Sequence, residues 1–398
     1  MLRVVAATPL LMLTSCVAYF AAPADPSAIA LEIRQREGGR LSFAQAVPRA
    51  FAQNATLQAL AARARAAGAI TTPIELEAEY RSGTEMLAVM IDPIALLGFG
   101  PRGGALEVTK AEAEAAAQEL ANARWRVTAA ITEAFAIEAA LAPLTAPEIP
   151  VEAEAFLRAG LAGPTIAAKV RAAQARAAAE AIELANARSA NLAELGELLG
   201  LGHETDVELL PLPPDLLVQP PPGDASVLQR PDLTLAAARF QTADAEFRSA
   251  VADQYPSLML GPEIPLMGNP LEAMAVLRLP IGRHGVAAAA SERREAARAE
   301  LFGAYLAANR EAHHTELEFG AATAQLTAAK VGRDAADQAL RSALVSAEVE
   351  VDAFERVADA ADMAVRSAME LREATIAEAR LRVRHAVAHG WPIARQAQ

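Results

Sequence analysis

Apolar residues recur at helical spacing from Leu41 to about Gly68. Ser42 stands at the N-cap position of this segment, and Pro48 lies either in its first turn or at a brief interruption. The helix is expected to end at Thr72, because the residue before a proline, here Pro73, is disfavoured in the helical conformation. The pattern predicts an alanine-rich opening helix followed by a change of structure.

The spacing then changes to a period of two. Apolar and charged residues alternate from Ile74 to Arg81, Ser82 to Thr84 supplies a turn, and Met86 to Ile91 returns. This alternation is typical of a β-hairpin with one apolar and one charged face. A glycine-rich exit at Gly98 to Gly104 then leads into a long helical segment from Ala105 to about Ala140.

The same order of elements occurs twice. Leu233 to Arg239 opens the second half as Leu57 to Arg63 opens the first, and Pro256 ends the second opening helix. A second hairpin follows, with strands at Ser257 to Ile264 and Ala273 to Leu279. The chain is therefore an internal duplication whose units each combine a helix, a hairpin and a long helical pair.

The hairpins and the long helices favour an elongated membrane-associated protein. Strands of about nine to ten residues are long enough to cross a bilayer with tilt, although soluble half-buried hairpins alternate in the same way. Four strands cannot close a barrel in lipid, because open edges leave backbone groups unpaired, so we expect an oligomer. The helix from Val286 to about Ala343 would extend roughly 85 Å, more than a compact domain requires.

Composition agrees with thin helical walls. The chain has 398 residues, of which 53% are hydrophobic but only 4% aromatic. Alanine dominates, and it combines high helix propensity with little buried area per residue. An ordinary alanine-rich globular protein would share this composition, so the argument depends on the repeat. The formal charge of −13 argues against a nucleic-acid partner, because neutralising phosphates requires clustered lysine and arginine.

The N-terminus has the pattern of an export signal. Met1 to Arg3 forms a short basic region, and Val4 to Leu13 is an apolar run too short for a permanent membrane span. Leu13 to Cys16, which contains the only cysteine, resembles the lipobox of bacterial lipoproteins, in which cleavage precedes a cysteine that receives a diacylglyceryl group. Val17 follows, which in such lipoproteins favours sorting to the outer membrane. A single cysteine excludes an intramolecular disulfide.

Candidate catalytic chemistry is sparse. His385 and His389 share a helix face at a spacing of four, but without a third ligand they are interpreted as surface residues rather than a zinc site. His313 and His314 point in different directions on a helix. No nucleophile, base and orienting group recur at interpretable positions, and the glycine-rich exits lack the ending of a phosphate-binding loop. The sequence predicts no enzyme activity, no cofactor and no metal site.

Several ordered motifs carry a family resemblance. Gln229 to Leu233 (Gln-Arg-Pro-Asp-Leu) opens a helix that leads through Ala236, Ala243 and Ala245 to Tyr255-Pro256-Ser257-Leu258. Leu195 to Gly200 closes the first repeat, and Leu157 to Leu161 matches a tip turn. From about Leu41 to Gly390 the chain resembles the TolC-type outer-membrane efflux proteins, in the lipoprotein branch that serves metal and multidrug tripartite pumps.

The resemblance implies a mainly α fold in which duplicated coiled-coil repeats form a periplasmic tunnel. Four strands per chain would contribute to a twelve-stranded outer-membrane β-barrel in a homotrimer. The chain would be a passive channel, lipid-anchored in the outer membrane, that exports small molecules or metal ions. Its partners would be a periplasmic adaptor protein and, through the adaptor, an inner-membrane pump. Nearby outer-membrane lipid would surround the barrel.

The resemblance also places residues at the periplasmic entrance. These tip residues are Arg158 and Gly160 in the first repeat and Leu344, Glu348, Glu350 and Asp352 in the second. The second tip is expected at Leu340 to Leu344. The acidic cluster that continues to Glu355 is either a solvated helix start or, by family analogy, a ring that selects cations.

The predicted segments follow from these boundaries. They are a signal peptide (1–15), a lipidated tether (16–40), repeat 1 (41–200), a proline-rich linker (201–228), repeat 2 (229–390) and a C-terminal tail (391–398). Prolines from Pro211 to Pro222 exclude a helix in the linker, which the resemblance assigns to the belt around the tunnel and the crossover to the second repeat.

Three departures from the family pattern keep other functions open. Pro143, Pro147 and Pro150 interrupt the helix that should descend to the first tip, Ala343 stands where the first tip has a glycine, and barrel aromatics are sparse. A degenerate efflux paralogue and a periplasmic structural lipoprotein remain alternatives. A periplasmic adaptor would also have long helical hairpins, but it would need a β-domain for which the strands are too few.

Overall fold

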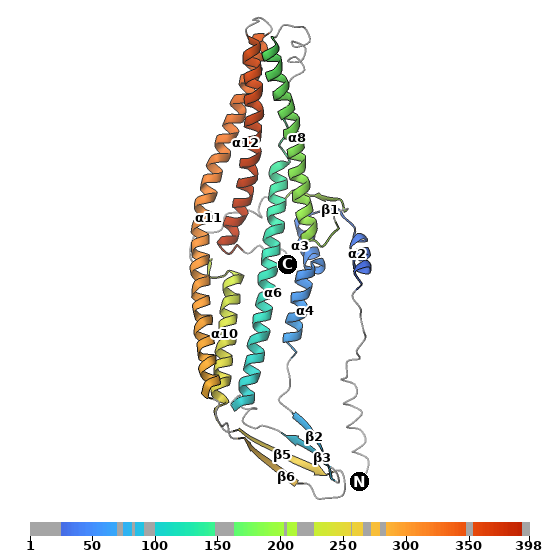
Figure 1. Cartoon of the computed structure of the whole chain (residues 1–398), viewed down its shortest axis with the longest axis vertical. Helices are drawn as coiled ribbons and strands as arrows, with labels where there is room; N and C mark the ends of the chain where they lie inside the picture. Colours follow the sequence, from blue (N-terminus) through green and yellow to red (C-terminus); the bar gives the residue numbers. More distant parts are fainter. Residues whose placement is uncertain are drawn as a thin grey trace.

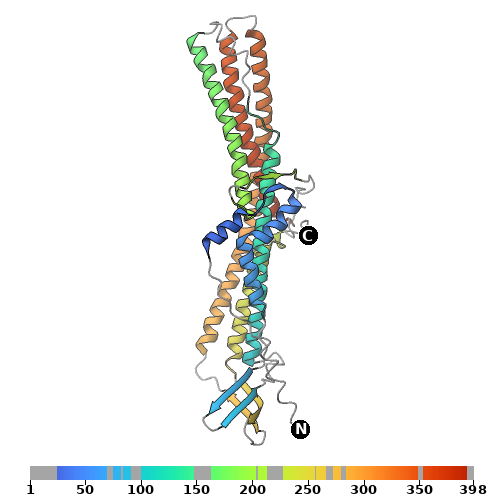
Figure 2. The same cartoon turned by 90° about the vertical axis from the view of Figure 1, so that its right-hand side faces the viewer.

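The computed structural model is an elongated, mainly helical molecule with a β-sheet at one end (Figures 1 and 2). None of the helices in its described part has a stretch apolar and long enough to cross a bilayer. The described residues are 25–69, 75–81, 84–90, 100–147, 163–202, 205–212, 227–255, 257–265, 272–278, 284–347 and 353–391.

The opening helix is two helices, α3 (Phe43–Gln53) and α4 (Ala55–Ala67). Ser42 caps α3 as predicted, and its backbone N–H donates to the Gln45 side chain at 3.0 Å. Neither position expected for Pro48 holds, because Pro48 lies inside α3, beyond its first turn and without interrupting the helix. The break lies at Asn54, whose backbone is extended and whose side chain accepts from the backbone N–H of Leu57 at 3.1 Å.

The first long helix, α6 (Gly100–Leu141), ends just before the prolines that predicted an interruption. It begins earlier than expected, so the glycine-rich exit overlaps its first turn. Close packing against α10 explains one of these glycines, Gly104. A Cβ at this position would lie 2.8 Å from the Cα of Ser249, closer than two such atoms can approach. The second helix of the pair is α8 (Pro164–Leu198), which begins with a proline at its first position.

The second repeat has an uninterrupted long helix. α10 (Pro231–Ala252) is followed beyond the second hairpin by α11 (His284–Ala347) and α12 (Ala353–Ala388). The 64 residues of α11 extend about 96 Å, so this helix runs nearly the whole length of the molecule in Figure 1. α11 packs against α10 over one half of its length and against α12 over the other.

The two hairpins join edge to edge into one antiparallel sheet in the order β2-β3-β5-β6. Its strands are β2 (Glu75–Arg81), β3 (Thr84–Met90), β5 (Ser257–Pro265) and β6 (Glu272–Arg278). β3 and β5 pair through Leu87 and Ile264, which links the two repeats. β5 has the nine residues expected, whereas β2, β3 and β6 have seven each, fewer than the nine to ten expected. β2 and β6 are open edges of this sheet.

The expected tether and linker contain regular structure that the sequence did not predict. α2 (Pro26–Arg34) lies in the tether, and β1 (Gly39–Leu41) pairs in parallel with β4 (Val207–Leu209) of the linker. Together with α3 they lie at mid-height beside the end of α8 (Figure 1). We call β1, β4 and α3 the belt.

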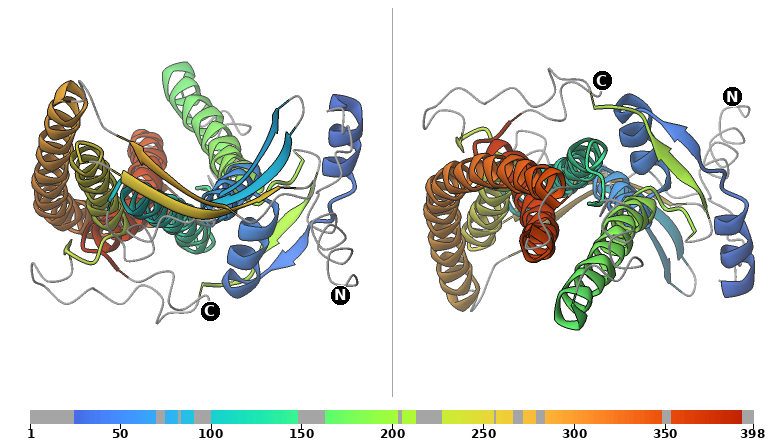
Figure 3. Two further views of the ribbon diagram at one scale, coloured as in Figure 1. Left: turned by 90° about the horizontal axis from the view of Figure 1, so that it is seen from below. Right: turned by 90° about the horizontal axis from the view of Figure 1, so that it is seen from above.

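Alanine makes the core thin, as the composition predicts. α12 buries sixteen residues along its length, and most of them are alanine or valine. The larger buried side chains gather under the belt, where Phe43 meets Phe135 edge-to-face with ring centroids 5.8 Å apart. Seen end-on in Figure 3, the helices form a curved layer rather than a closed bundle. This layer leads directly into the curved sheet.

Candidate functional site

Most of the predicted site residues lie outside the described part of the chain. Cys16 precedes its first residue, Asp25. The gap at 148–162 contains two tip residues, Arg158 and Gly160, and the gap at 348–352 contains Glu348, Glu350 and Asp352. Their roles in lipidation and at the entrance stay predictions.

Leu344 is described, and it does not lie in a turn. The turn expected at Leu340 to Leu344 is wrong, because α11 continues through this segment to Ala347. The segment holds no proline or glycine, and alanine favours helix, so nothing in it ends the helix. Leu344 is half-buried and packs against the cluster that joins α8, α11 and α12.

The far end of the molecule, at the top of Figure 1, consists of the start of α8, the end of α11 and the start of α12. A buried cluster joins the three helices, with Val170 from α8, Leu340 from α11 and Phe354 from α12. Alanines fill most of the remaining positions, which allows the helices to approach closely. This end is therefore a packed three-helix unit in the described part of the chain.

Ion pairs link α8 to α12 along the far end. Lys169 contacts Glu355 at 3.2 Å and Asp359 at 3.0 Å, and Arg176 pairs with Asp362. Hydrogen bonds to Asp359 and Glu355 raise the pKa of Lys169. Glu355, which sequence analysis grouped with the acidic cluster, is thus engaged with a lysine of a neighbouring helix.

One of these links is buried. The Arg372 guanidinium binds the Glu180 carboxylate through two bonds, Nε to Oε1 at 2.7 Å and Nη2 to Oε2 at 3.3 Å. The Arg372 side chain is 14% exposed and the Glu180 side chain 4%. The hydrogen bond to Glu180 raises the pKa of Arg372. A bidentate pair with this burial fixes the relative height of α8 and α12.

The described helical layer contains fewer helices at the far end, because α6 ends at Leu141. Leu141, its last residue, packs against Leu184 of α8, and its carbonyl accepts from the Arg188 guanidinium at 2.6 Å. α8 continues about 30 Å past this level to Pro164. In the described part of the chain, α8, α11 and α12 make up the layer beyond Leu141.

α8 and α12, the two helices that run back from the far end, end in the same motif at mid-height of the molecule. Gly200 after α8 and Gly390 after α12 have positive φ, 65° and 70°. The next residues, Leu201 and Trp391, each donate a backbone hydrogen bond to the carbonyl five residues before them, at 2.8 and 3.0 Å. These are Schellman endings with glycine at the left-handed position. The duplication therefore extends to helix caps.

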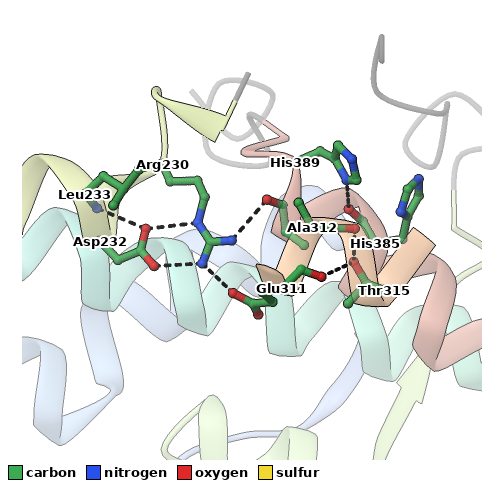
Figure 4. Close-up of polar contacts among 9 residues, drawn as sticks. Arg230, Asp232, Leu233, Glu311, Ala312, Thr315, His385 and His389 are labelled. Atoms are coloured by element: carbon green, nitrogen blue, oxygen red, sulfur yellow. Dashed lines mark hydrogen bonds and ion pairs between the residues drawn. The ribbon is translucent and has the colours of Figure 1, made fainter. Parts of the chain in front are cut away.

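In each repeat, the N-cap residue of the short helix, α4 or α10, donates a hydrogen bond to the end of α8 or α12. In repeat 1 the Asn54 amide donates to the Leu198 carbonyl at 3.1 Å. In repeat 2 the equivalent residue is Arg230, whose Nη1 donates to the Ala388 carbonyl at 3.0 Å (Figure 4). Leu198 and Ala388 are the last residues of α8 and α12. We call these contacts the repeat-1 anchor and the repeat-2 anchor.

The repeat-2 anchor is charged. The Arg230 side chain, 5% exposed, binds Asp232 at 2.7 Å and Glu311 of α11 at 2.7 Å. Its guanidinium carbon lies 5.7 Å from the ring centroid of Trp125 on α6. Burial alone would lower the pKa of Arg230, but the hydrogen bonds to Asp232 and Glu311 outweigh it and raise that pKa. Arg230 thus joins α6, α10, α11 and α12.

His385 and His389 lie in the same last turn of α12, and both are half-buried rather than fully exposed. The His385 ring is stacked on Phe319 of α11 with centroids 5.4 Å apart, and lies 4.4 Å from the His389 ring. Burial lowers the pKa of His385. Among the described residues no group of three His, Cys, Asp or Glu could hold a metal ion.

The described part of the chain resembles solved outer-membrane channels. It matches the outer-membrane channel OprN with a TM-score of 0.69 and 19% identity over 88% of this chain and 90% of that chain. VceC, an outer membrane protein of Vibrio cholerae, matches with a TM-score of 0.68 and 20% identity over 87% and 96%. The Neisseria gonorrhoeae MtrE outer membrane channel, in its open state, gives 0.64 and 16% over 89% and 90%.

The chain has the fold of these channel proteins. The TolC-like helical fold that the sequence resemblance implied is thereby confirmed, and the trimeric twelve-stranded barrel stays a prediction. No protein-family model matches the sequence, and no curated protein matches it either. The likeness therefore lies in the backbone arrangement.

Sequence analysis did not single out the anchors or the links between α8 and α12. Arg230 entered only as part of a helix-start motif. One signal could have found the anchors: Leu195 to Leu201 aligns with His385 to Trp391, glycine on glycine. The ion pairs had no such signal, because residues of α8 and α12 that are almost 200 positions apart meet only in the folded chain.

Proposed function

We propose that this chain is one subunit of a trimeric channel in the bacterial outer membrane, through which small molecules or metal ions pass passively. The observation that carries the proposal is the open, curved layer of helices that continues into an open, curved sheet (Figure 3). Such a layer encloses a passage only when copies join at its edges. The solved channels of the same fold support this reading.

The sheet favours closure between copies. β2 and β6 carry unpaired backbone groups along their outer edges, and in lipid each such group costs several kcal/mol. Edge-to-edge pairing of β6 with β2 of the next copy would satisfy them and close a barrel. Three copies of four strands would give twelve, the number implied by the family resemblance.

The helical layer offers a second edge. Five of the seven large hydrophobic side chains that are exposed along the described part of α11 lie within about 80° of arc, at 100° per residue. They are Phe302, Leu306, Leu317, Val331 and Val345. A stripe of this length on a soluble surface is unusual, and covering it with the opposite edge of the next copy gives a head-to-tail interface that closes into a ring.

The cellular arrangement follows from the proposed channel. We propose that Cys16 anchors the chain to the outer membrane by its lipid and that the helical layer extends into the periplasm. The far end would then face a periplasmic adaptor and, through it, an inner-membrane pump. Arg158, Gly160, Leu344, Glu348, Glu350 and Asp352 would belong to the entrance at that end.

The early end of α6 favours a second candidate. Beyond Leu141 the described layer has three helices, and a wall of this kind closes less completely than one of four. A trimeric lipoprotein that spaces the envelope without conducting would have the same interfaces. Conductance separates the two candidates.

Oligomeric state and conductance test the proposal. Purified full-length protein in mild detergent should be a trimer by light scattering and should give stepwise, ohmic conductance in planar bilayers. The variant Phe302→Ser/Val331→Ser should shift the protein toward monomer, because it interrupts the stripe. Leu31→Ser changes an equally exposed residue on α2 and should stay trimeric.

Each result has a defined consequence. A monodisperse wild-type monomer with intact strands would overturn the assembly. A trimer without conductance would overturn the channel and leave the envelope spacer. Equal behaviour of the two variants would show that the α11 stripe is not the interface.

A further inference from the structure

The last helical turn at the repeat-2 anchor carries side chains of a different chemical kind from those at the repeat-1 anchor. In repeat 1 the last turn of α8 presents Leu195 and Leu199, both fully buried in the cluster under the belt. At the aligned positions of repeat 2 the last turn of α12 presents His385 and His389. The same backbone motif thus carries two apolar side chains in one copy and two titratable rings in the other.

The geometry around His385 suits its neutral form. His385 is stacked on Phe319, and its Nδ1 is buried without a hydrogen-bond partner. A protonated ring would bring an N–H and a positive charge to a position where no acceptor compensates for lost water. The His389 ring, 4.4 Å away, would add repulsion if it carried a charge as well.

The surrounding charges do not reverse this preference. Arg230 lies at the same helix end, bound to the Ala388 carbonyl between the two histidines in sequence. Glu316 on α11 favours a protonated His385, but its effect is smaller than those of burial and of His389, so the pKa of His385 is lowered. On α12 itself Arg384 faces Glu133 of α6.

The histidines and Arg230 hold one helix end. The His389 ring Nδ1 and its backbone N–H both contact the His385 carbonyl, at 2.9 and 3.2 Å. The last carbonyl of the helix, that of Ala388, accepts from Arg230. Figure 4 shows Arg230, at the start of α10, bound both to the last turn of α12 and to Glu311 of α11. A charge at the buried Nδ1 of His385 would therefore strain the contact of this turn with Phe319 of α11.

We propose that the repeat-2 anchor is an acid-sensitive fastening, in which protonation of His385 loosens the last turn of α12 from α11. The repeat-1 anchor, built from leucines and Asn54, does not respond to acid. Acidification would thus loosen one of the two mid-height attachments of the helical layer and leave the other in place.

The sign of the pH dependence follows from linkage. His385 has a lower pKa in the folded chain than its ordinary value of 6.5. Its contribution to the stability of the anchor is therefore fully present above pH 6.5 and is lost as the pH falls through the folded value. At neutral pH the anchor is closed, and at mildly acidic pH it opens more often.

Hydrogen exchange on the full-length protein in detergent tests the proposal. Protection factors for residues 385–391, corrected for the intrinsic pH dependence of exchange, should fall about tenfold from pH 7.5 to 5.0, the size expected for losing one hydrogen bond to a charged group. Residues 195–201 of the repeat-1 anchor should keep their protection over the same range. They serve as an internal control.

Variants taken from the other repeat isolate the histidines. His385→Leu/His389→Leu places the repeat-1 residues in repeat 2 and should abolish the fall at residues 385–391. His385→Phe keeps a ring against Phe319 and removes the titrating nitrogen, so it should reduce the fall even if the double variant does not fold. His313→Gln changes an exposed histidine of α11 and should behave as wild type.

Two results would overturn the fastening. Protection of residues 385–391 that does not change between pH 7.5 and 5.0 in the wild type would show that protonation has no effect on the anchor. A fall of equal size in His385→Phe would show that the titrating group lies elsewhere. Neither measurement depends on conductance, so the proposed channel and the proposed fastening can fail separately.

Discussion

Replacing Arg372 by methionine would leave a carboxylate buried without its counter-ion. Glu180 of α8 is only 4% exposed, and Arg372 donates a hydrogen bond to each of its two carboxylate oxygens. Methionine retains the apolar stem of the side chain and removes the guanidinium. The perturbation therefore tests the charge pair at the junction of α8 and α12, with little change in packing.

The burial sets the expected magnitude. Breaking a buried pair by removing one partner destabilises by about 3–5 kcal/mol, whereas replacing both partners by apolar residues is often neutral. Arg176, which pairs with Asp362 on the same two helices, is 52% exposed. Removing such an exposed pair costs about 0–1 kcal/mol. A loss of 3 kcal/mol increases local opening by more than about a hundredfold.

Local hydrogen exchange of α8 and α12 in the full-length protein measures this opening. Arg372→Met should lower the protection around residues 176–184 and 368–376 by about a hundredfold or more. Arg176→Met is the matched control and should lower it by less than about fivefold. Glu180→Leu/Arg372→Met should recover most of the lost protection.

The double variant decides the reasoning. Recovery there would show that the unpaired carboxylate caused the loss in the single variant. A double variant as unprotected as Arg372→Met would contradict this account and assign the effect to packing of the arginine stem. Equal effects of Arg372→Met and Arg176→Met would show that burial does not distinguish the two pairs.

Three further predictions concern the ending of α8, the lipid attachment at Cys16 and the periplasmic entrance. In thermal unfolding, Gly200→Ala should destabilise repeat 1 by more than about 1 kcal/mol, because Gly200 has a φ of 65° and an added Cβ would lie 2.6 Å from the Gln53 carbonyl oxygen. The control Gly196→Ala places its Cβ in open space and should be neutral or stabilising. Cys16→Ser should abolish palmitate labelling and leave the signal uncleaved or misprocessed, and labelling that persists would contradict lipidation. The variant Glu348→Gln/Glu350→Gln/Asp352→Asn neutralises the acidic entrance residues and should weaken cation preference and divalent block in planar bilayers. Unchanged selectivity would favour a solvated helix start.

Local patterns in the sequence specified the elements and their order. The alternation at Ile74 to Arg81 located β2, and the proline before Asp232 located the start of α10. The prolines after Leu141 located the end of α6. These signals are strong because each acts on its own backbone: a proline removes a donor, and alternation fixes one face.

Boundaries failed where a distant residue decided the conformation. The opening helix breaks at Asn54, because its side chain caps α4 and also reaches the Leu198 carbonyl at the end of α8. The belt was missed because β1 and β4 have three residues each and form only through their pairing with one another. A short parallel pair leaves no periodic signal in either segment.

The sequence by itself determined that the chain is a duplicated, thin-walled helical protein with two hairpins, because periodicity, proline and alanine act locally. Its family resemblance also led to the correct fold. Only the tertiary structure decided which polar residues matter. Arg372 meets Glu180, and His385 meets Phe319, because helices distant in sequence lie side by side at a fixed height. Burial and partnership, which set the energy of a charge, are properties of that arrangement and not of the residues alone.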